Sequence, residues 1–233
     1  MALPQEHPFR KHAENLAAVR QGLVQIERLH KAAIRRNDAA AVTHCRRMHL
    51  LTVGMLAEAF LAKICSDPSG FNERERHVLW SERSQIDRWI RAIDLAFRRH
   101  FAVLLHEDPF TSLPQTEATQ YALLQELLDQ ELRPVIEYRN KAAHSQWVWL
   151  LNSKGTQFSG KADPPPNYRG TWARARLIEE LADLIHILVV SEPTFQRDYD
   201  RSMTKVGEYR SNIDGADYSD FVAHLQRTKR PRT

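Results

Sequence analysis

Cysteine, glycine and long apolar stretches are scarce in this sequence of 233 residues, and each scarcity excludes a class of protein. The two cysteines, Cys45 and Cys65, fall in one predicted helix about 30 Å apart, too far for a disulfide within a straight helix. We therefore expect buried thiols in a reducing compartment. The N-terminal stretch has no apolar signal core, and no apolar run approaches the roughly 18 residues of a membrane span. The sequence thus predicts a cytoplasmic protein with no membrane association.

Sequence features that hold a phosphate, a metal ion or a serine nucleophile are also missing. The chain has no glycine-rich phosphate loop and no serine nucleophile motif. His44, Cys45 and His49 lie close together, but Cys-x3-His within a helix lacks the paired ligands and the return spacing of a zinc site. Core or surface roles suit these residues better, and we expect neither a metal nor a cofactor.

The charge balance is mildly basic, with a formal net charge of +4 and a sequence pI of about 9.2. Such a balance attracts an anionic partner only where the charge is clustered. A cluster of basic residues could be an anion-binding surface. We prefer to interpret the clusters within helices as solvated helix faces and the C-terminal cluster as a disordered end. The clusters are Arg35-Arg36, Arg46-Arg47, Arg98-Arg99 and residues 227–232.

Apolar residues recur at intervals of three and four over most of the chain, which predicts an all-α protein. The second predicted helix is apolar nearly all round and should lie at the centre. We expect Asn72 to cap a short charged segment. Loops are expected at Asp67–Gly70 and at His106–Pro114. Long helices are expected over 12–36, from an Asn37-Asp38 cap to Ile64, over 86–104, from Thr116 to Leu128, and over 172–190.

Pro134 sets the direction of a further helix that carries the most informative residues. Proline cannot donate a backbone hydrogen bond and clashes with the preceding turn, so it either kinks a helix or begins a new one. Residues 147–158 then predict a short hairpin-like or extended insertion, followed by a loop over 161–170. We expect an up-and-down helical domain over 1–190. Residues 191–233 have weak periodicity and are predicted to form an appendage, partly helical or mobile, with a basic end.

The stretch RNKAAHSQW places Arg139, Asn140 and His144 within one and a half helical turns. Histidine titrates near neutral pH and can move a proton, whereas arginine stays charged and can bind phosphate oxygens through its fork of donors. Asn140 can orient either partner by hydrogen bonding. At about 100° per residue, Asn140 lies near His144 but Arg139 is about 140° away from it. A two-fold axis that brings a second copy alongside would make a converging site easier to form.

These residues resemble the active-site segment of HEPN proteins, a helical superfamily with many metal-independent RNA-cleaving toxins and defence factors. Tyr138 and Gln146 support the resemblance, as does the order of long helices before the motif. The resemblance implies a dimeric endoribonuclease for single-stranded RNA, with Arg139, Asn140 and His144 as catalytic residues. Tyr138, Lys141, Gln146 and Trp147 are candidate substrate-binding residues, and an antitoxin or defence-system protein is a candidate partner.

Other interpretations of the same residues stay open. Arg139 could pair with Glu137 or with an acidic residue of a neighbouring helix, and His144 could cap a helix end. Arg99 and His106 satisfy the same spacing rule, although His106 falls at a helix end. The alternative function is a non-catalytic helical module that binds RNA or a partner protein, and a weaker one is a DNA-binding accessory protein that uses the basic tail.

Overall fold

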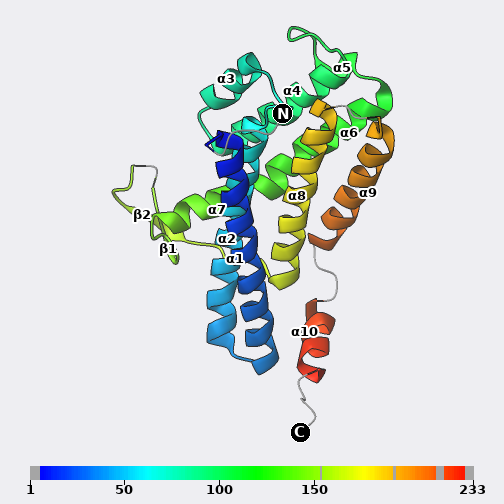
Figure 1. Ribbon diagram of the computed structural model, residues 1–233. Coiled ribbons are helices and arrows are strands. Elements are labelled where there is room, and N and C mark those ends of the chain that lie inside the picture. The colour runs from blue at the N-terminus through cyan, green and yellow to red at the C-terminus, as the bar shows by residue number, and fades with distance from the viewer. Residues whose placement is uncertain (1–5, 153, 191–192, 214–217, 229–233) are drawn as a thin grey trace.

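The chain folds mostly into helices, with one small hairpin (Figure 1). The structure is a computed structural model that describes residues 6–152, 154–190, 193–213 and 218–228. Helices account for 77% of the chain, which confirms the predicted helical class. The helices are α1 (Pro8–Arg36), α2 (Ala39–Ser66), α3 (Glu73–Ser81), α4 (Gln85–His100), α5 (Pro109–Ser112), α6 (Gln115–Leu127), η1 (Leu128–Leu132), α7 (Arg133–Ala143), α8 (Tyr168–Val190), α9 (Phe195–Ile213) and α10 (Tyr218–Arg227).

Helices α1 and α2 form a long antiparallel pair (Figure 1), and the two residues predicted to separate them do so. Asn37 ends α1 in the left-handed conformation, with φ 56°, and its amide donates to the last carbonyls of the helix. Asp38 then caps α2, because its Oδ1 accepts a hydrogen bond of 2.9 Å from the amide of Ala41. The turn is therefore determined by local sequence.

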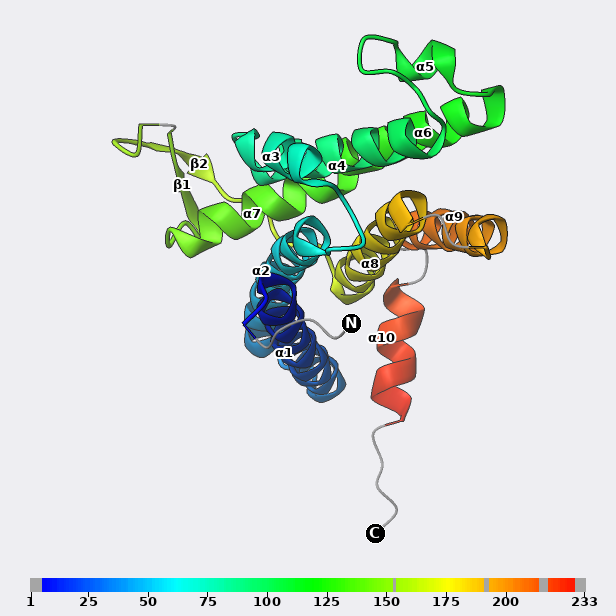
Figure 2. The same cartoon turned by 45° about the horizontal axis from the view of Figure 1, so that its top comes forward.

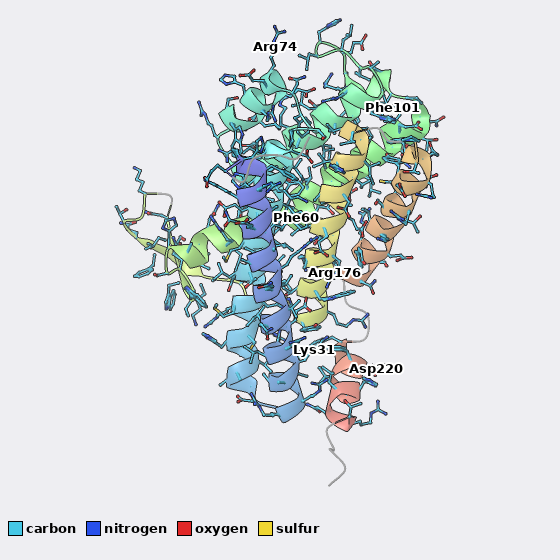
Figure 3. All side chains as sticks on the ribbon, viewed as in Figure 1. Lys31, Phe60, Arg74, Phe101, Arg176 and Asp220 are labelled. Carbon is cyan, nitrogen blue, oxygen red and sulfur yellow. The ribbon has the colours of Figure 1, made fainter. Side chains whose placement is uncertain are left out.

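Helix α2 lies at the centre of the protein, as its apolar composition predicts. Val53, Leu56 and Ala57 are fully buried in it, and Phe60, labelled in Figure 3, belongs to the same core. By length and composition α2 could cross a membrane, but 56% of its most apolar stretch is buried inside the protein, as in the core helix of a globular fold. The predicted break after it begins at the C-cap, Asp67.

Helix α3 begins with a capping box, in which Asn72 accepts from the amide of Glu75 while the Glu75 carboxylate accepts from the amide of Asn72. The interval 106–114, predicted to be a loop, instead contains the single turn of α5, because Pro109 can start a turn that Asp108 caps.

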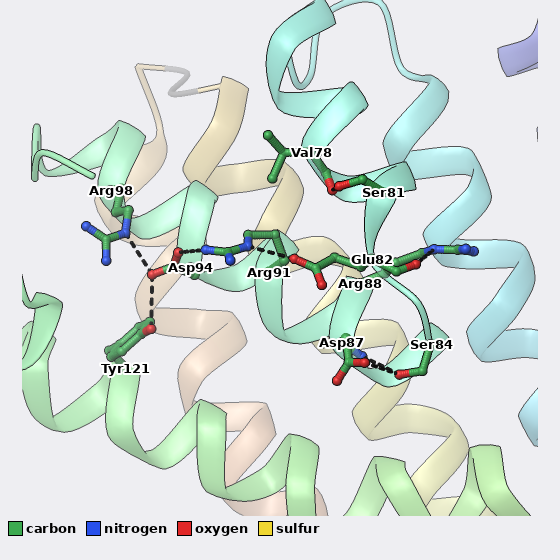
Figure 4. Close-up of polar contacts among 10 residues, drawn as sticks. All are labelled: Val78, Ser81, Glu82, Ser84, Asp87, Arg88, Arg91, Asp94, Arg98 and Tyr121. Carbon is green, nitrogen blue, oxygen red and sulfur yellow. Dashed lines mark hydrogen bonds and ion pairs between the residues drawn. The ribbon is translucent and has the colours of Figure 1, made fainter. Parts of the chain in front are cut away.

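A buried carboxylate fixes the end of α4 (Figure 4). Asp94 accepts from Arg91 Nη1 at 3.1 Å, from Arg98 Nε at 2.8 Å and from the hydroxyl of Tyr121 on α6 at 3.2 Å. Arg98 also donates to the carbonyl oxygen of Glu107 in the following loop. The group thus ties α4, the loop and α6 together.

Pro134 lies in the first turn of α7, as one of the two predicted alternatives has it, but no break precedes that helix. Helices α6, η1 and α7 follow one another without a break, and Figure 2 shows α7 continuing the line of α6 beside α4. The chain widens to a π-turn at Leu128–Leu132, directly before the proline. Such a turn accommodates a residue that cannot donate a hydrogen bond inside a helix.

The predicted insertion after α7 is a two-stranded antiparallel hairpin of β1 (Trp149–Leu151) and β2 (Phe158–Lys161). Its register is irregular between Leu150 and Leu151, so one strand has an extra residue there. The hairpin stands out from the helices next to the end of α7 (Figure 1), and Trp149 and Phe158 are 50% and 72% exposed. A proline-rich loop then returns the chain to α8.

Helix α8 begins at Tyr168, four residues earlier than predicted, and runs through the core beside α2 and α4. Helix α9 packs along α8, and its Tyr199, Val206 and Ile213 belong to the same hydrophobic core as the helices before residue 190. The segment predicted to be an appendage therefore contributes to the main core. Helix α10 covers a smaller cluster through Leu225. Most of the predicted basic end, residues 229–233, lies outside the described residues.

Candidate functional site

The motif helix α7 ends in a hydrogen-bonded turn that fixes the position of His144. Ser145 has a left-handed backbone with φ 63°, and its amide donates to the carbonyl of Ala142 at 3.1 Å. The amide of Gln146 donates to the carbonyl of Lys141 at 2.9 Å, which completes a Schellman motif. The indole of Trp147 donates to the same Ala142 carbonyl at 2.9 Å. His144 is thus the C-cap of α7, as the alternative interpretation anticipated.

Arg139 lies against α2, where the backbones of the two helices approach closely. A Cβ atom added at Gly54 would lie 2.4 Å from Arg139 Cβ, so the absence of a side chain at Gly54 makes the crossing possible. The Arg139 guanidinium forms an ion pair with Glu58 of α2 and donates through Nη1 to Asn140 Oδ1 at 3.0 Å. The acidic partner of Arg139 is therefore on a neighbouring helix.

His144 and Asn140 are both exposed at the end of α7. Within the described residues, no hydrogen bond or ion pair engages the imidazole of His144, and none joins it to Arg139. The structure thus joins the side chains of Arg139 and Asn140 by a hydrogen bond, and within the described residues it joins neither of them to the imidazole of His144. The imidazole is accessible to a substrate or to a second protein molecule.

The four candidate substrate-binding residues surround the same helix end. Trp147 stacks on His44 of α2, with ring centroids 6.2 Å apart and an angle of 15° between the ring planes. Lys141 lies 3.8 Å from Glu137, one turn before it. The Oε1 atom of Gln146 accepts from the amide of Leu151 at 2.9 Å and so fastens the hairpin to α7.

Tyr138 is half-buried, and its hydroxyl has no hydrogen-bond partner among the described residues. Burial raises the pKa of this hydroxyl, and the nearby positive charge of Arg47 offsets only part of that rise. Tyr138 is therefore neutral at neutral pH, and its hydroxyl is buried without a partner.

A cleft of about 290 Å³, which we call the α7 cleft, lies between α7, the hairpin and the loop that follows it. Its polar members include three of the four candidate substrate-binding residues, and Trp147 is not among them. The cleft is lined by Leu50, Pro134, Val135, Glu137, Tyr138, Lys141, Gln146, Leu150, Ala162, Asp163, Pro164, Pro165, Pro166 and Arg174.

Sequence reasoning missed two residues that position Arg139, namely Gly54 and Glu58. Glu58 is the single acidic residue within the apolar helix α2, and that isolation is the signal that could have drawn attention to it. Gly54 gives no comparable signal, because its role depends on where α7 crosses.

The competing candidates from the sequence occupy structural positions. Arg99 donates to the carbonyl of Gly70 at 3.0 Å and pairs with Glu75 at 3.2 Å, so it anchors α3 to α4. His49 is buried, whereas His44 is exposed on the same helix. Over the described part of the chain, no group of three histidine, cysteine, aspartate or glutamate residues is arranged to hold a metal ion.

Comparisons with protein-family models, with curated proteins and with solved structures found no match to this chain. The resemblance to HEPN proteins therefore rests on the sequence around Arg139, Asn140 and His144 alone.

Proposed function

We propose that this protein is a metal-independent endoribonuclease that cleaves single-stranded RNA at Arg139, Asn140 and His144. The observation that carries the proposal is the end of α7, where a guanidinium, a carboxamide and an accessible imidazole follow one another on the helix and its C-cap. The resemblance to HEPN proteins supports the same activity and a toxin or defence setting.

Each residue has a separate part in the proposed reaction. One His144 imidazole removes the proton of a ribose 2′-hydroxyl, whose oxygen attacks the adjacent phosphorus. The bond from phosphorus to the 5′-oxygen breaks, and that oxygen takes a proton from a protonated imidazole. Arg139 binds the phosphate oxygens and stabilises the negative charge of the transition state, while Asn140 orients the guanidinium. The products are a 2′,3′-cyclic phosphate and a 5′-hydroxyl end.

The reaction needs a proton acceptor and a proton donor, and one copy of the motif supplies one histidine. We propose that two chains meet at the ends of α7 around a two-fold axis, so that two His144 side chains serve one phosphate. Exposed apolar side chains lie beside the motif, where such a contact would cover them: Val148 is 45% exposed and Phe158 is 72% exposed.

An RNA-cleavage assay in EDTA tests the activity. The wild-type protein is expected to cut single-stranded RNA, and His144→Ala and Arg139→Ala are each expected to lower the rate by at least 100-fold, the scale on which loss of an acid-base or charge-stabilising group acts. His106→Ala removes an exposed histidine outside the motif and serves as the matched control, with an unchanged rate. Equal cleavage by all four proteins would remove the motif from the mechanism.

The ion pair between Arg139 and Glu58 favours a second candidate, a non-catalytic helical module that binds RNA or a partner protein. A carboxylate that already holds the guanidinium competes with phosphate, as expected of a structural arginine. Glu58→Gln separates the two candidates. If Arg139 binds phosphate, removing the competing charge strengthens RNA binding; if Arg139 is structural, the variant lowers the melting temperature and leaves RNA binding unchanged.

A further inference from the structure

The α7 cleft differs in charge from the proposed phosphate site. Two acidic and two basic residues line it, and the basic ones are already paired. Lys141 lies 3.8 Å from Glu137, and Arg174 pairs at 2.7 Å with Glu131. Because its charges balance, the cleft offers no field that would draw in a phosphate group. Prolines and leucines form much of the remaining wall, which suits a flat, uncharged ring.

The size and position of the cleft also restrict its occupant. About 290 Å³ lies just below the usual range of small-molecule sites, a size that suits one ring system rather than a larger ligand. Lys141 lines the cleft and His144 follows three residues later, a spacing that makes two residues neighbours on a helix. A chain whose phosphate lies at the motif would therefore place an adjacent base at the cleft.

Gln146 gives the cleft a hydrogen-bond donor of fixed orientation. Its Oε1 accepts from the amide of Leu151 at 2.9 Å, which leaves the Nε2 amino group as the outward end of the carboxamide. Within the described residues the one side-chain hydrogen bond of Gln146 is the one that its Oε1 accepts, so the amino group is left for a ligand. The Tyr138 hydroxyl is also unpaired, but it is buried. An outward amino group without a partner in a mostly apolar cleft can recognise the edge of a base.

We propose that the α7 cleft binds one nucleobase of single-stranded RNA beside the phosphate at the motif, and that Gln146 reads it. This inference rests on the proposed function for its choice of ligand. The Nε2 amino group donates to a carbonyl on the base, so a base with a carbonyl at the position that is read binds better than one with an amino group. Uracil carries a carbonyl at C4 where cytosine carries an amino group.

The test measures fluorescence anisotropy of labelled hexamers of uridine and of cytidine, bound to full-length protein. His144→Ala is the background in every sample, so that the RNA is not cut. Gln146→Glu keeps the acceptor for the Leu151 amide and replaces the outward donor with an acceptor. Gln157→Glu makes the same change of charge at an exposed position of the hairpin outside the cleft, and equal melting temperatures show that each variant folds.

We expect uridine to bind about tenfold more tightly than cytidine, the effect of one gained and one mismatched hydrogen bond. Gln146→Glu is expected to remove or reverse this ratio, and Gln157→Glu to preserve it while lowering both affinities alike. A ratio that is the same with and without Gln146→Glu overturns the proposal, as does failure of both hexamers to bind. The cleavage assay separates this proposal from the proposed function. If the wild-type protein cuts no RNA but Gln146→Glu still removes or reverses the preference for uridine, the nuclease activity is rejected and the base-binding cleft is retained.

Discussion

Two buried histidines make the stability of this protein depend on pH. His30 of α1 and His49 of α2 are both 0% exposed, and their Nδ1 atoms are 3.4 Å apart. In a hydrogen bond at this distance one Nδ1 donates and the other accepts, so the two imidazoles cannot both be protonated while they keep this contact. Tyr168 of α8 packs on both rings, at centroid distances of 5.2 and 5.5 Å.

Burial lowers the pKa of both groups from the ordinary value of 6.5. The pKa of His30 falls to about 4, with a further contribution from the charge of Arg46. The pKa of His49 falls to about 3, and His30 and Lys31 add to the effect of burial. Glu27 lies 4.0 Å from His49 Nε2, and burial raises the pKa of its carboxyl group.

The sign of the pH dependence follows from these lowered values. Below about pH 6.5 the unfolded chain binds protons that the folded protein does not, so stability is complete at neutral pH and decreases as the pH falls towards 4. Each group changes the free energy of unfolding by about 1.4 kcal/mol per pH unit. Between pH 7 and pH 5 the pair accounts for a loss of about 4 kcal/mol, against a total of about 5–15 kcal/mol for a typical domain. Glu27 offsets part of this loss, since its raised pKa acts in the opposite direction.

Urea unfolding at pH 7 and pH 5 measures this loss, with His30→Gln, His49→Gln and His77→Gln as variants. Either buried substitution is expected to reduce the difference between the two pH values by about 2 kcal/mol, whatever it does to stability at pH 7. His77 is an exposed histidine of α3, and its replacement leaves the difference unchanged. The reasoning is refuted if the wild-type protein and both buried variants lose equal stability between pH 7 and pH 5.

Two further predictions concern packing and the buried carboxylate. Gly54→Ala places a Cβ atom 2.4 Å from Arg139 Cβ, so we expect a loss of about 1–3 kcal/mol in urea unfolding and weaker RNA binding; an unchanged melting temperature would contradict the close approach of α2 and α7. Asp94→Ala leaves Arg98 with no carboxylate partner in the described residues, and we expect a loss of about 3–5 kcal/mol. Tyr121→Phe removes one hydrogen bond to the same carboxylate and should cost about 1 kcal/mol; equal losses in the two variants would show that the carboxylate does not organise the group.

The sequence by itself determined the features that depend on residues close together in the chain. Asn37 and Asp38 separate α1 from α2, Asn72 caps α3, and the turn after Leu151 forms a hairpin, all as predicted. These features follow from backbone hydrogen bonds over a few residues, for which side-chain type and backbone preference are sufficient.

Only the tertiary structure decided which residues surround the motif. Arg139 and Glu58 are 81 positions apart, and neither residue indicates the other until α2 and α7 cross at Gly54. The π-turn before Pro134 and the place of α9 in the core depend likewise on packing between distant segments, which weak local periodicity does not reveal. His30 and His49 look like ordinary surface or core histidines in the sequence. Packing removes them from water, and that loss of hydration gives them their altered pKa values.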